Sequence, residues 1–488
     1  METSRKSFSV KNRRIAMNSS ERFLAALKSN MERLYYSMQC IAISAYDAYN
    51  RGMPHYTVDE PIYALATPFA PSALAVIRAS GDGVLSMLEP LFTGKLMKAP
   101  TNTAVHGFLV GSDGRKIDEV VIIKYGKGHG YTSEEAFEIM CHGSLPVIRA
   151  ISLALESQGI REAERGEFTY RAFMHGRMDL TEAEAVEEIV KSKSESASQD
   201  ALSRLSGSIR AEADSIRSSL LDILASLEVQ LDYGEDEIPE EWVFPHDEVS
   251  RIISRLESIA ATYDASRLYS SGASVVLAGR TNAGKSSLYN AILEENRSIV
   301  SSSEGTTRDY IETECLIGDI PVHLFDTAGL RDTDESIERE GIERTRKLME
   351  RADLIVYVLD GNEEEPSGIG ENALVVRSKR DITGASGSLS FSSVTGEGLG
   401  DVLKAIEERL LEGSSIASDV PRIDSERQRG CLLDAASALC DAENAVDSGE
   451  DVVAMYIQLA LSSLSALTGA VTSDELLDRL FSSFCLGK

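Results

Sequence analysis

The 488-residue sequence predicts a chain of mixed class, α/β plus all-α, in which a helical domain is interrupted by an inserted α/β domain. Three observations predict this class. Short apolar strands mixed with helices run to about residue 177, apolar residues at helical spacing fill 180–265 and 415–488, and strands alternate with helices over 272–412. Because the two helical stretches flank a complete unit, we expect them to pack into one bundle. The alternative is two separate helical hairpins.

The chain divides into five segments. Residues 1–57 are basic, and we expect a dispensable, partly disordered extension, either an organellar transit peptide or the product of a misread upstream start. Residues 58–177 form the first α/β domain, with strands predicted at 62–66, 73–78 and 119–125 and a helix at 144–158. The remaining segments are 178–271, the first helical part; 272–412, the inserted domain; and 413–488, the second helical part.

Helix signals are strong in the first helical part. Thr181, with Glu184 three residues further on, predicts a capping box at the start of a helix over 182–192. Apolar residues at helical spacing, Leu202 among them, predict one long helix over 199–229. Another helix over 247–270 is expected to lead into the inserted domain.

Composition limits the partners and the compartment. Hydrophobic residues make up 43% and charged residues 26%, as in soluble globular proteins. The net charge of −29 argues against a broad nucleic-acid-binding face, so any RNA contact has to be local or supplied by a partner. The 6 cysteines contain no CxxC pair, which favours reduced thiols in a cytosol. Residues 452–471 carry no charge, yet polar residues and a leucine stripe favour a buried bundle helix over a membrane span.

A glycine-rich loop opens the inserted domain. Residues 279–286, Gly-Arg-Thr-Asn-Ala-Gly-Lys-Ser, join an apolar strand to a helix, which is the context of a phosphate-binding P-loop. Gly279 and Gly284 let backbone N–H groups point at phosphate oxygens. Lys285 would reach the β- and γ-phosphates, and Ser286 would ligate Mg²⁺. The alternative is a chance glycine-rich turn.

Polar residues at later strand ends predict a guanine nucleotide. Asp326 would hold a water of the Mg²⁺ shell, and Thr306 or Thr307 would close on Mg²⁺ when GTP is bound. Asp381 would accept hydrogen bonds from both donors of the guanine edge, which favours GTP over ATP. Leu330 cannot orient water as a glutamine at its position often does, so an acid in the loop 332–340 has to take that role if hydrolysis occurs.

Three separated motifs together resemble the tRNA modification GTPase MnmE (TrmE) family over residues 58–488. They are the G-domain matches 279–286, 305–309 and 326–330; the junction 166–173 (Gly-Glu-Phe-Thr-Tyr-Arg-Ala-Phe) with 177–180 and 182–185; and the C-terminal Cys-Leu-Gly-Lys. The resemblance implies an N-terminal folate-binding and dimerisation domain and a helical domain into which a Ras-like P-loop GTPase (G) domain is inserted.

The resemblance also implies a potassium-activated GTPase whose G domains meet face to face. Glu338 would position the attacking water, with Lys285 as the other catalytic group of the G domain. Magnesium would bind Ser286 and Thr307, and potassium would bind Asn282, Ser301, Ser303 and Thr306. The residues expected to contact GTP are Asn282, Ala283, Gly284, Lys285, Ser286, Ser287, Ser301, Ser302, Ser303, Glu304, Gly305, Thr306, Thr307, Asp326, Thr327, Ala328, Gly329, Ser378, Lys379, Arg380, Asp381, Ser392, Ser393 and Val394.

The N-terminal domain would bind 5-formyl-tetrahydrofolate or a related tetrahydrofolate through four residues, with Cys485 directed at the same site. The four are Arg78, Glu138, Arg177 and Lys488. Without the resemblance, the first three read as a strand-end surface arginine, a helix-face glutamate and a solvated loop arginine.

The resemblance implies a cytoplasmic homodimer, with no membrane, that forms a heterotetramer with an FAD-binding partner of the MnmG (GidA) type. The two proteins would modify the wobble uridine of certain tRNAs at C5 with an aminomethyl or carboxymethylaminomethyl group, using a folate one-carbon unit and GTP hydrolysis. The alternatives are an RNA- or ribosome-assembly GTPase without modification chemistry and a switch that only binds GTP.

Two positions depart from the family pattern. Ser378 replaces the asparagine of the family's Asn-Lys-x-Asp motif, which predicts weaker guanine nucleotide binding with unchanged base choice because a hydroxyl offers fewer hydrogen bonds. Residues 68–73, Pro-Phe-Ala-Pro-Ser-Ala, replace a glycine-rich turn and leave the path of that loop open.

Overall fold

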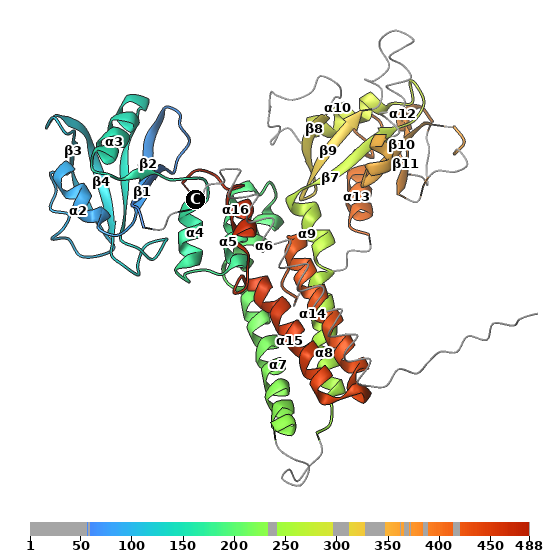
Figure 1. Cartoon of the computed structure of the whole chain (residues 1–488). Coiled ribbons are helices and arrows are strands. Elements are labelled where there is room, and N and C mark those ends of the chain that lie inside the picture. Colours follow the sequence, from blue (N-terminus) through green and yellow to red (C-terminus); the bar gives the residue numbers. More distant parts are fainter. Residues whose placement is uncertain are drawn as a thin grey trace, which may run out of the picture.

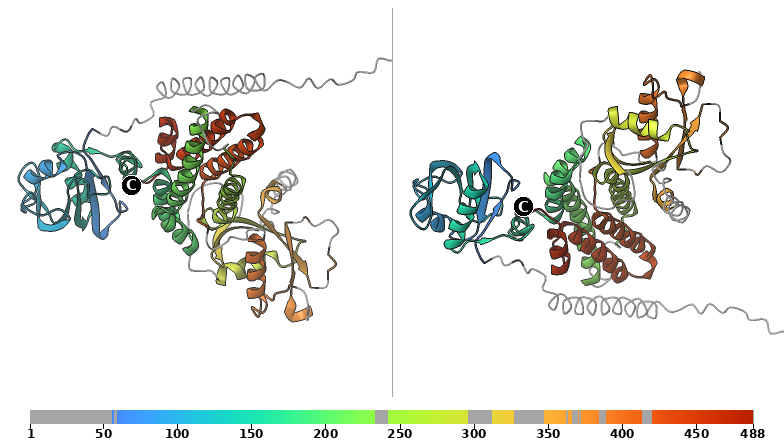
Figure 2. Two further views of the ribbon diagram at one scale, coloured as in Figure 1. Left: turned by 90° about the horizontal axis from the view of Figure 1, so that it is seen from below. Right: turned by 90° about the horizontal axis from the view of Figure 1, so that it is seen from above.

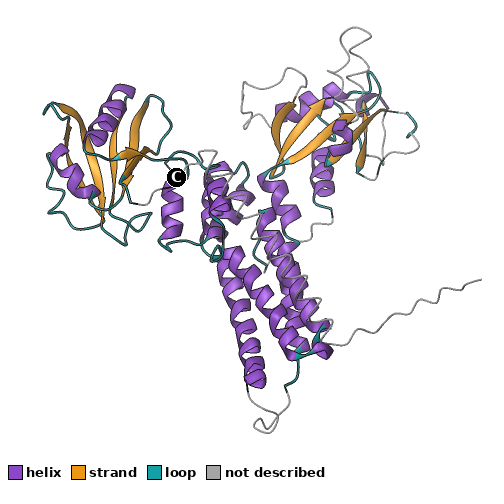
Figure 3. Ribbon diagram, in the orientation of Figure 1, coloured by secondary structure: helices purple, strands orange, loops and turns teal. Residues whose placement is uncertain are grey.

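The computed structural model describes residues 56, 59–232, 242–295, 312–326, 347–361, 363–365, 370, 372–383, 389–412 and 420–487. The extension predicted over 1–57 lies outside these residues apart from Tyr56. Two sheet-containing units lie on either side of a helical part, in all three views (Figures 1 and 2). Colouring by secondary structure shows that the middle part holds helices and no described strand (Figure 3). The predicted class, α/β plus all-α, is therefore confirmed, while the exact domain limits stay predictions.

The N-terminal unit is built on a six-stranded sheet of order β3-β4-β5-β2-β1-β6, antiparallel except where β1 meets β6. Its strands are β1 (Ile62–Leu65), β2 (Ser72–Ser80), β3 (Thr103–Val110), β4 (Lys116–Tyr125), β5 (Ala136–Gly143) and β6 (Arg161–Glu162). Its helices are α2 (Val84–Leu88), the 3-10 turn η1 (Glu89–Leu91) and α3 (Leu145–Ser157). The reading of Glu138 as a helix-face residue was wrong, because Glu138 lies on β5 directly opposite Arg78 on β2.

The junction leads into α4 (Glu167–Met174), α5 (Leu180–Lys191), α6 (Glu195–Leu205) and α7 (Ser208–Asp232). The predicted capping box at Thr181 and Glu184 was wrong by two residues. Asp179 is the N-cap of α5: its Oδ1 accepts from the Glu182 amide at 2.8 Å, and its own amide donates to Glu182 Oε2 at 2.7 Å. Thr181 supports this box by donating to Asp179 Oδ1 at 2.8 Å.

Two predicted long helices are each divided. The helix expected over 199–229 is divided between α6 and α7. The break lies at Gly207, which has a left-handed backbone with φ 85°. Leu202, one of the apolar residues whose spacing predicted the helix, is 56% exposed on α6. The helix expected over 247–270 is likewise divided into α8 (His246–Ala260) and α9 (Tyr263–Ser270).

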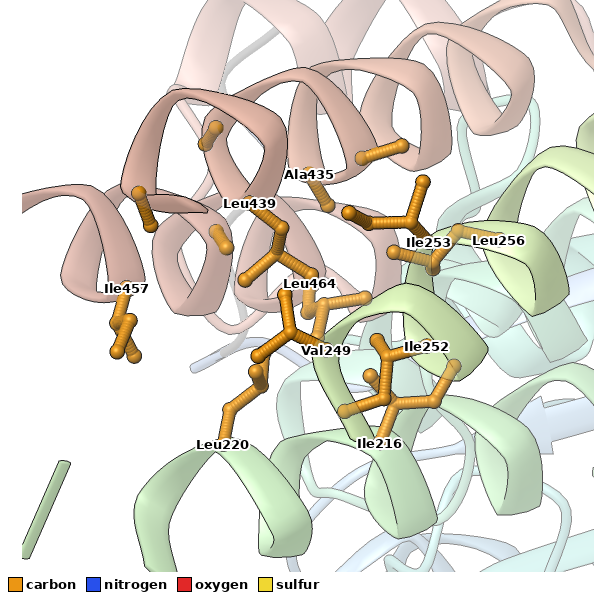
Figure 4. Close-up of a cluster of buried hydrophobic side chains, with 14 of the residues drawn as sticks. Ile216, Leu220, Val249, Ile252, Ile253, Leu256, Ala435, Leu439, Ile457 and Leu464 are labelled. Carbon is orange, nitrogen blue, oxygen red and sulfur yellow. The ribbon is translucent and has the colours of Figure 1, made fainter. Parts of the chain in front are cut away.

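A single bundle joins the two helical parts of the chain. The C-terminal part supplies α14 (Glu426–Asn444), the 3-10 turn η4 (Val446–Ser448), α15 (Glu450–Thr468) and α16 (Asp474–Phe481). Leu220 of α7, Val249 of α8, Leu439 of α14 and Leu464 of α15 meet in one buried cluster (Figure 4). The prediction of one bundle is confirmed, and the alternative of two separate hairpins was wrong. Within the described residues, α15 alone has the length and hydropathy of a membrane span, and it buries its apolar side in this bundle.

The inserted unit has a five-stranded sheet of order β11-β10-β7-β9-β8, parallel except for β8. Its strands are β7 (Ala273–Ala278), β8 (Glu312–Ile317), β9 (Ile320–Asp326), β10 (Leu354–Asp360) and β11 (Ala373–Ser378). Its helices are α10 (Lys285–Glu295), α12 (Arg380–Thr383) and α13 (Leu399–Leu410). Parallel strands converge their carboxyl ends on one edge, where ligands of such sheets bind.

The inserted unit also completes a helix of the helical part. Asp319, in the turn between β8 and β9, accepts from the backbone amides of Glu195 at 3.0 Å and Ser196 at 2.7 Å. Ser194 is the N-cap of α6 and accepts from the amide of Ala197 at 3.1 Å. Three of the N–H groups at the start of α6 are therefore satisfied, two of them by the inserted unit.

Candidate functional site

The carboxyl edge of the second sheet holds a cavity of about 660 Å³. The loop after β7 lines one side of the cavity, and the segment after β11 lines the other. Its lining residues are Thr281, Asn282, Gly284, Lys285, Ser286, Ser287, Ser378, Lys379, Asp381, Ile382, Phe391, Ser393 and Val394. Ten of the thirteen were predicted as nucleotide contacts, so the fold brings the predicted strand ends together as expected.

The glycine-rich loop is shaped by its close approach to β10. A Cβ on Gly279, whose φ is 137°, would lie 2.2 Å from the carbonyl oxygen of Val358, so only glycine fits there. Lys285 is 7% exposed and donates from Nζ to the carbonyl oxygens of Gly279 at 3.0 Å and Arg280 at 2.9 Å. The ammonium is thereby positioned over the hollow of its own loop.

A hydroxyl and a carboxylate meet at the start of α10. Ser286 donates from Oγ to Oδ2 of Asp326, at the end of β9, over 2.8 Å, and Asp326 is 7% exposed. These hard oxygen donors fit Mg²⁺, which keeps several waters and takes few protein ligands. No group of three or more metal-binding side chains was found in the part of the chain that the structure describes.

The segment after β11 is held against the glycine-rich loop. Ser378 is 2% exposed and donates from Oγ to the carbonyl oxygen of Ala283 at 2.7 Å. Lys379 has a left-handed backbone with φ 61°, and its Nζ lies 2.6 Å from Oδ2 of Asp360 at the end of β10. Asp381 lies on the cavity wall, where the guanine-reading carboxylate was predicted.

Several predicted residues lie outside the described residues. They are Ser301, Ser302, Ser303, Glu304, Gly305, Thr306, Thr307, Thr327, Ala328, Gly329, Glu338 and Lys488. The potassium loop, the second magnesium ligand and the water-positioning glutamate are therefore predictions on sequence alone.

A second cavity, of about 230 Å³, lies in the N-terminal unit and is lined by Arg78, Glu138 and Arg177. Arg78 donates from Nη2 to Glu138 Oε1 at 3.1 Å and from Nη1 to the carbonyl oxygen of Gly487 at 3.0 Å. The guanidinium also lies 5.6 Å from the ring centroid of Tyr131, a cation–π distance. The three predicted residues are thus brought together with the penultimate residue of the chain.

The tyrosines of this cavity remain neutral at physiological pH. Burial raises the pKa of Tyr131, and burial together with the neighbouring Glu138 raises that of Tyr125. The Tyr125 hydroxyl therefore keeps its proton and donates a hydrogen bond to Glu138 Oε2 over 3.3 Å. Cys485 is exposed near the same end of the chain.

The sequence reasoning missed a buried ionic network behind this cavity. Ser80, on the cavity wall, donates to Glu134 Oε2 at 2.7 Å, and its oxygen lies 2.5 Å from that of Thr132. Arg171 is fully buried and donates to Glu134 at 3.3 Å and to Glu167 at 2.8 Å. The only signal of this network in the sequence was the junction motif 166–173, which contains Glu167 and Arg171.

Comparison with known proteins identifies the family. Residues 61–177 match the profile of the GTP-binding protein TrmE N-terminus, and residues 180–485 match that of the MnmE helical domain. The chain belongs to the MnmE family of tRNA modification GTPases. The tRNA modification GTPase MnmE of Treponema denticola is 36% identical, over 89% of this chain and 99% of the relative. The MnmE of Thermus thermophilus is 37% identical, over 88% and 99%.

Membership in the MnmE family confirms the predicted resemblance and the fold class. The C-terminal half of the family's helical domain follows the inserted unit, which explains why the profile spans 180–485 without a break. Among solved structures, the G domain of the Thermotoga maritima FeoB iron transporter is 24% identical, covers 29% of this chain and 99% of that one, and has a TM-score of 0.22. That similarity is too low to support an argument about function.

Proposed function

We propose that this chain hydrolyses GTP in a potassium-dependent reaction and takes part, with a flavin-dependent MnmG-type partner, in modifying the wobble uridine of certain tRNAs at C5. The added group would be aminomethyl or carboxymethylaminomethyl, with the one-carbon unit taken from a tetrahydrofolate. The supporting observation is that one chain of this family holds both a P-loop cavity and a second cavity lined by Arg78, Glu138 and Arg177.

In the P-loop cavity, each described residue has a definite task. Lys285 exchanges the carbonyl oxygens of its own loop for the β- and γ-phosphates, which bind an ammonium more strongly because they are charged. Ser286 and Asp326, with Thr307, would hold Mg²⁺, which neutralises charge on the phosphates. Asp381 selects guanine, and Ser392, Ser393 and Val394 complete the base pocket.

Hydrolysis needs a positive charge and an ordered water. The potassium site would be formed by Asn282 with Ser301, Ser303 and Thr306, and the ion would take the place of an arginine finger. Glu338 would position the water. Because this arrangement is completed when two G domains meet, we propose a homodimer, and with the FAD-binding partner a cytoplasmic heterotetramer.

In the second cavity, the charged groups suit a folate. The Arg78 guanidinium offers donors and a cation–π surface, Glu138 accepts from N–H groups, and Arg177 and Lys488 would bind the glutamate tail. The carbonyl oxygen of Gly487 accepts a hydrogen bond from Arg78 across 409 residues of sequence, so the C-terminal segment that contains Cys485 is tied to a residue of the cavity wall.

The test combines one genetic and one kinetic measurement. A deletion strain is complemented with wild type, Glu338→Ala, Arg78→Ala and the control Asp334→Ala, an acid of the same loop, and its wobble uridines are measured by mass spectrometry. Glu338→Ala should lose about 100-fold in GTP turnover, with GTP binding unchanged. Both it and Arg78→Ala should lose the modified uridine, while Asp334→Ala should not. Wobble uridines that stay unmodified in the deletion strain complemented with the wild-type protein would refute the proposal.

A further inference from the structure

The cavity in the N-terminal unit is too small to enclose a whole folate. Its volume of about 230 Å³ lies below the range of roughly 300–1,000 Å³ that is usual for small-molecule sites. Arg78 and Glu138 face each other inside it, on the neighbouring strands β2 and β5. A pterin ring bound by this pair would leave the glutamate end of the folate outside, at the rim of the cavity.

A glycine-rich loop with two basic residues forms part of that rim. Residues 126–130, between β4 and β5, read Gly-Lys-Gly-His-Gly. The loop starts in close contact with the rest of the unit, because a Cβ on Gly126 would lie only 2.8 Å from the hydroxyl oxygen of Thr101. The two side chains that the loop carries, those of Lys127 and His129, belong to exposed residues. A ligand at the rim can therefore reach both of them.

His129 and Arg177 both line the cavity and have unused donors. His129 comes from the glycine-rich loop, and Arg177 comes from the loop between α4 and α5. Both residues are exposed. Within the described part of the chain, neither the imidazole of His129 nor the guanidinium of Arg177 has a hydrogen-bond or ion-pair partner. Their N–H groups are therefore available to an anion at the mouth of the cavity.

Lys127 adds a third basic group, which is only loosely held. Its Nζ lies 3.5 Å from Asp82 Oδ1, and the two side chains are 76% and 81% exposed. An ion pair as exposed as this one contributes little, so Lys127 can exchange Asp82 for a carboxylate of a ligand. Asp82 follows Ser80 of the cavity wall by two residues and Lys127 precedes His129 by two, so the pair lies at the same rim.

Other acids next to these groups are already engaged. Glu138 is paired with Arg78 over 3.1 Å inside the cavity. Glu135 is half-buried, and its Oε2 accepts from the amide of Gly83 at 3.2 Å. The basic groups of the rim outnumber the exposed acid that faces them, Asp82, even with the histidine neutral. In a chain whose net charge is −29, this local positive charge would attract an anionic group.

We propose that this rim binds an oligo-γ-glutamyl tail, so that the folate bound by this chain is a polyglutamate. The inference rests on the proposed folate site and extends it: Arg177 binds the first glutamate, and His129 and Lys127 bind the carboxylates of the next ones. Each γ-linked glutamate adds one carboxylate, which accepts charge-assisted hydrogen bonds from such donors. A folate tail is favoured over the phosphates of an RNA because two of the three basic residues line the cavity itself.

Four substitutions test the tail site. His129→Ala and Lys127→Ala each remove one basic group. Asp82→Asn removes the carboxylate that competes for Lys127 and keeps the shape of the side chain, so it should strengthen the tail contact. Arg115→Ala is the matched control, because Arg115 lies 3.5 Å from the exposed Asp113 on the same unit, just as Lys127 lies 3.5 Å from Asp82.

Calorimetry on the full chain compares 5-formyl-tetrahydrofolate with its triglutamate form, and the ratio of the two affinities is the readout. The wild type should bind the triglutamate roughly five- to twentyfold more tightly at low salt. Salt at about 0.5 M should reduce this ratio, because the groups involved are exposed. Each alanine variant of the rim should lower the ratio about two- to fivefold. Asp82→Asn should raise the ratio, and Arg115→Ala should leave it at the wild-type value.

Failure of the tail site is distinguishable from failure of the folate site. Equal affinities for the two folates would overturn the inference and leave the folate site standing, whereas absent binding of both would refute the folate site and the tail site with it. An unchanged ratio in both alanine variants would also overturn the inference. If these variants instead weaken binding of an anticodon stem–loop RNA, the rim serves the phosphates of tRNA. Melting curves and GDP affinity equal to wild type establish that the variants are folded.

Discussion

Ser378 donates a hydrogen bond from its hydroxyl to the carbonyl oxygen of Ala283, 2.7 Å away, and so joins the segment after β11, which is predicted to bind guanine, to the P-loop. The resemblance to the family implies asparagine at this position, so the serine was predicted to lose contacts with the nucleotide. The structure shows that the serine keeps one polar link between the two halves of the nucleotide cavity. Because Ser378 is 2% exposed, water cannot replace that link.

Ser378→Ala should therefore weaken GDP binding. The substitution leaves the buried carbonyl of Ala283 unpaired, at a cost of about 1–2 kcal/mol, or roughly 5–30-fold in affinity. Titration of a fluorescent GDP analogue measures it, and ATP should remain excluded because Asp381 is untouched. Ser378→Asn is the informative comparison: affinity above wild type would support the expectation that asparagine adds contacts, and an unchanged value would show that serine already suffices.

Asn282→Gly should abolish stimulation by potassium. Asn282 has a left-handed backbone with φ 65°, which glycine adopts without strain, so the substitution removes the amide and preserves the loop. GTPase rates in KCl should fall to the rate in NaCl, while GDP affinity stays near wild type. A variant that is still faster in KCl than in NaCl would show that Asn282 is not part of the potassium site. Equal rates of the wild type in the two salts would show that potassium does not stimulate hydrolysis.

Arg78→Ala should weaken binding of 5-formyl-tetrahydrofolate by roughly 10–100-fold, the scale of lost charged hydrogen bonds. The same substitution also frees Glu138 and Gly487, so the cavity loses its link to the C-terminal segment. Calorimetry on the full chain measures the affinity, and Arg115→Ala, 89% exposed on the same unit, is the control. Unchanged affinity for Arg78→Ala would contradict the folate assignment.

Glu188 should make the helical domain less stable as the pH rises. Burial, helped by the nearby Asp424, raises the pKa of Glu188 from 4.5 to about 7, against the opposing effect of Arg204, whose Nε donates to it at 3.0 Å. Between pH 4.5 and about pH 7, Glu188 therefore keeps its proton in the folded chain and loses it in the unfolded chain. The contribution is fully present below pH 4.5 and is lost as the pH rises through 7, about 3 kcal/mol in all.

Glu188→Gln should flatten this decline. Melting temperatures measured from pH 5 to pH 8 should fall less steeply in the variant than in wild type, because the amide cannot ionise. Glu228→Gln, an exposed glutamate of α7, should keep the wild-type slope. Parallel curves for wild type and Glu188→Gln would show that another acid governs the decline.

The nucleotide cavity was predictable from the sequence because its parts sit at strand ends. Once the P-loop fixed β7 as a central parallel strand, residues at the carboxyl ends of the other parallel strands had to converge on the same edge, and Ser378, at the end of β11, and Asp381, just after it, do so. The cavity proposed to bind folate was predictable only by resemblance. Its opposed pair, Arg78 and Glu138, depends on the register of β2 with β5, and the sequence did not reveal β5 as a strand.

Other features depend on tertiary contacts that local patterns do not encode. Two overlapping capping boxes, at Asp179 and at Thr181, are possible in the same stretch, and the earlier one forms in the structure. The pairing of Arg171 with Glu134 joins residues 37 positions apart in a buried network. Neither composition nor spacing distinguishes such an arginine from one on the surface.

Asp319 links the stability of the helical domain to the folding of the inserted domain. Its carboxylate satisfies the amides of Glu195 and Ser196, so the first turn of α6 is complete only while the β8–β9 turn is folded against it. Melting of the inserted sheet would uncover those two donors and weaken the neighbouring helix at the same time. The stability of the inserted domain and that of α6 are therefore expected to be coupled by the free energy of these two hydrogen bonds, about 1 kcal/mol each.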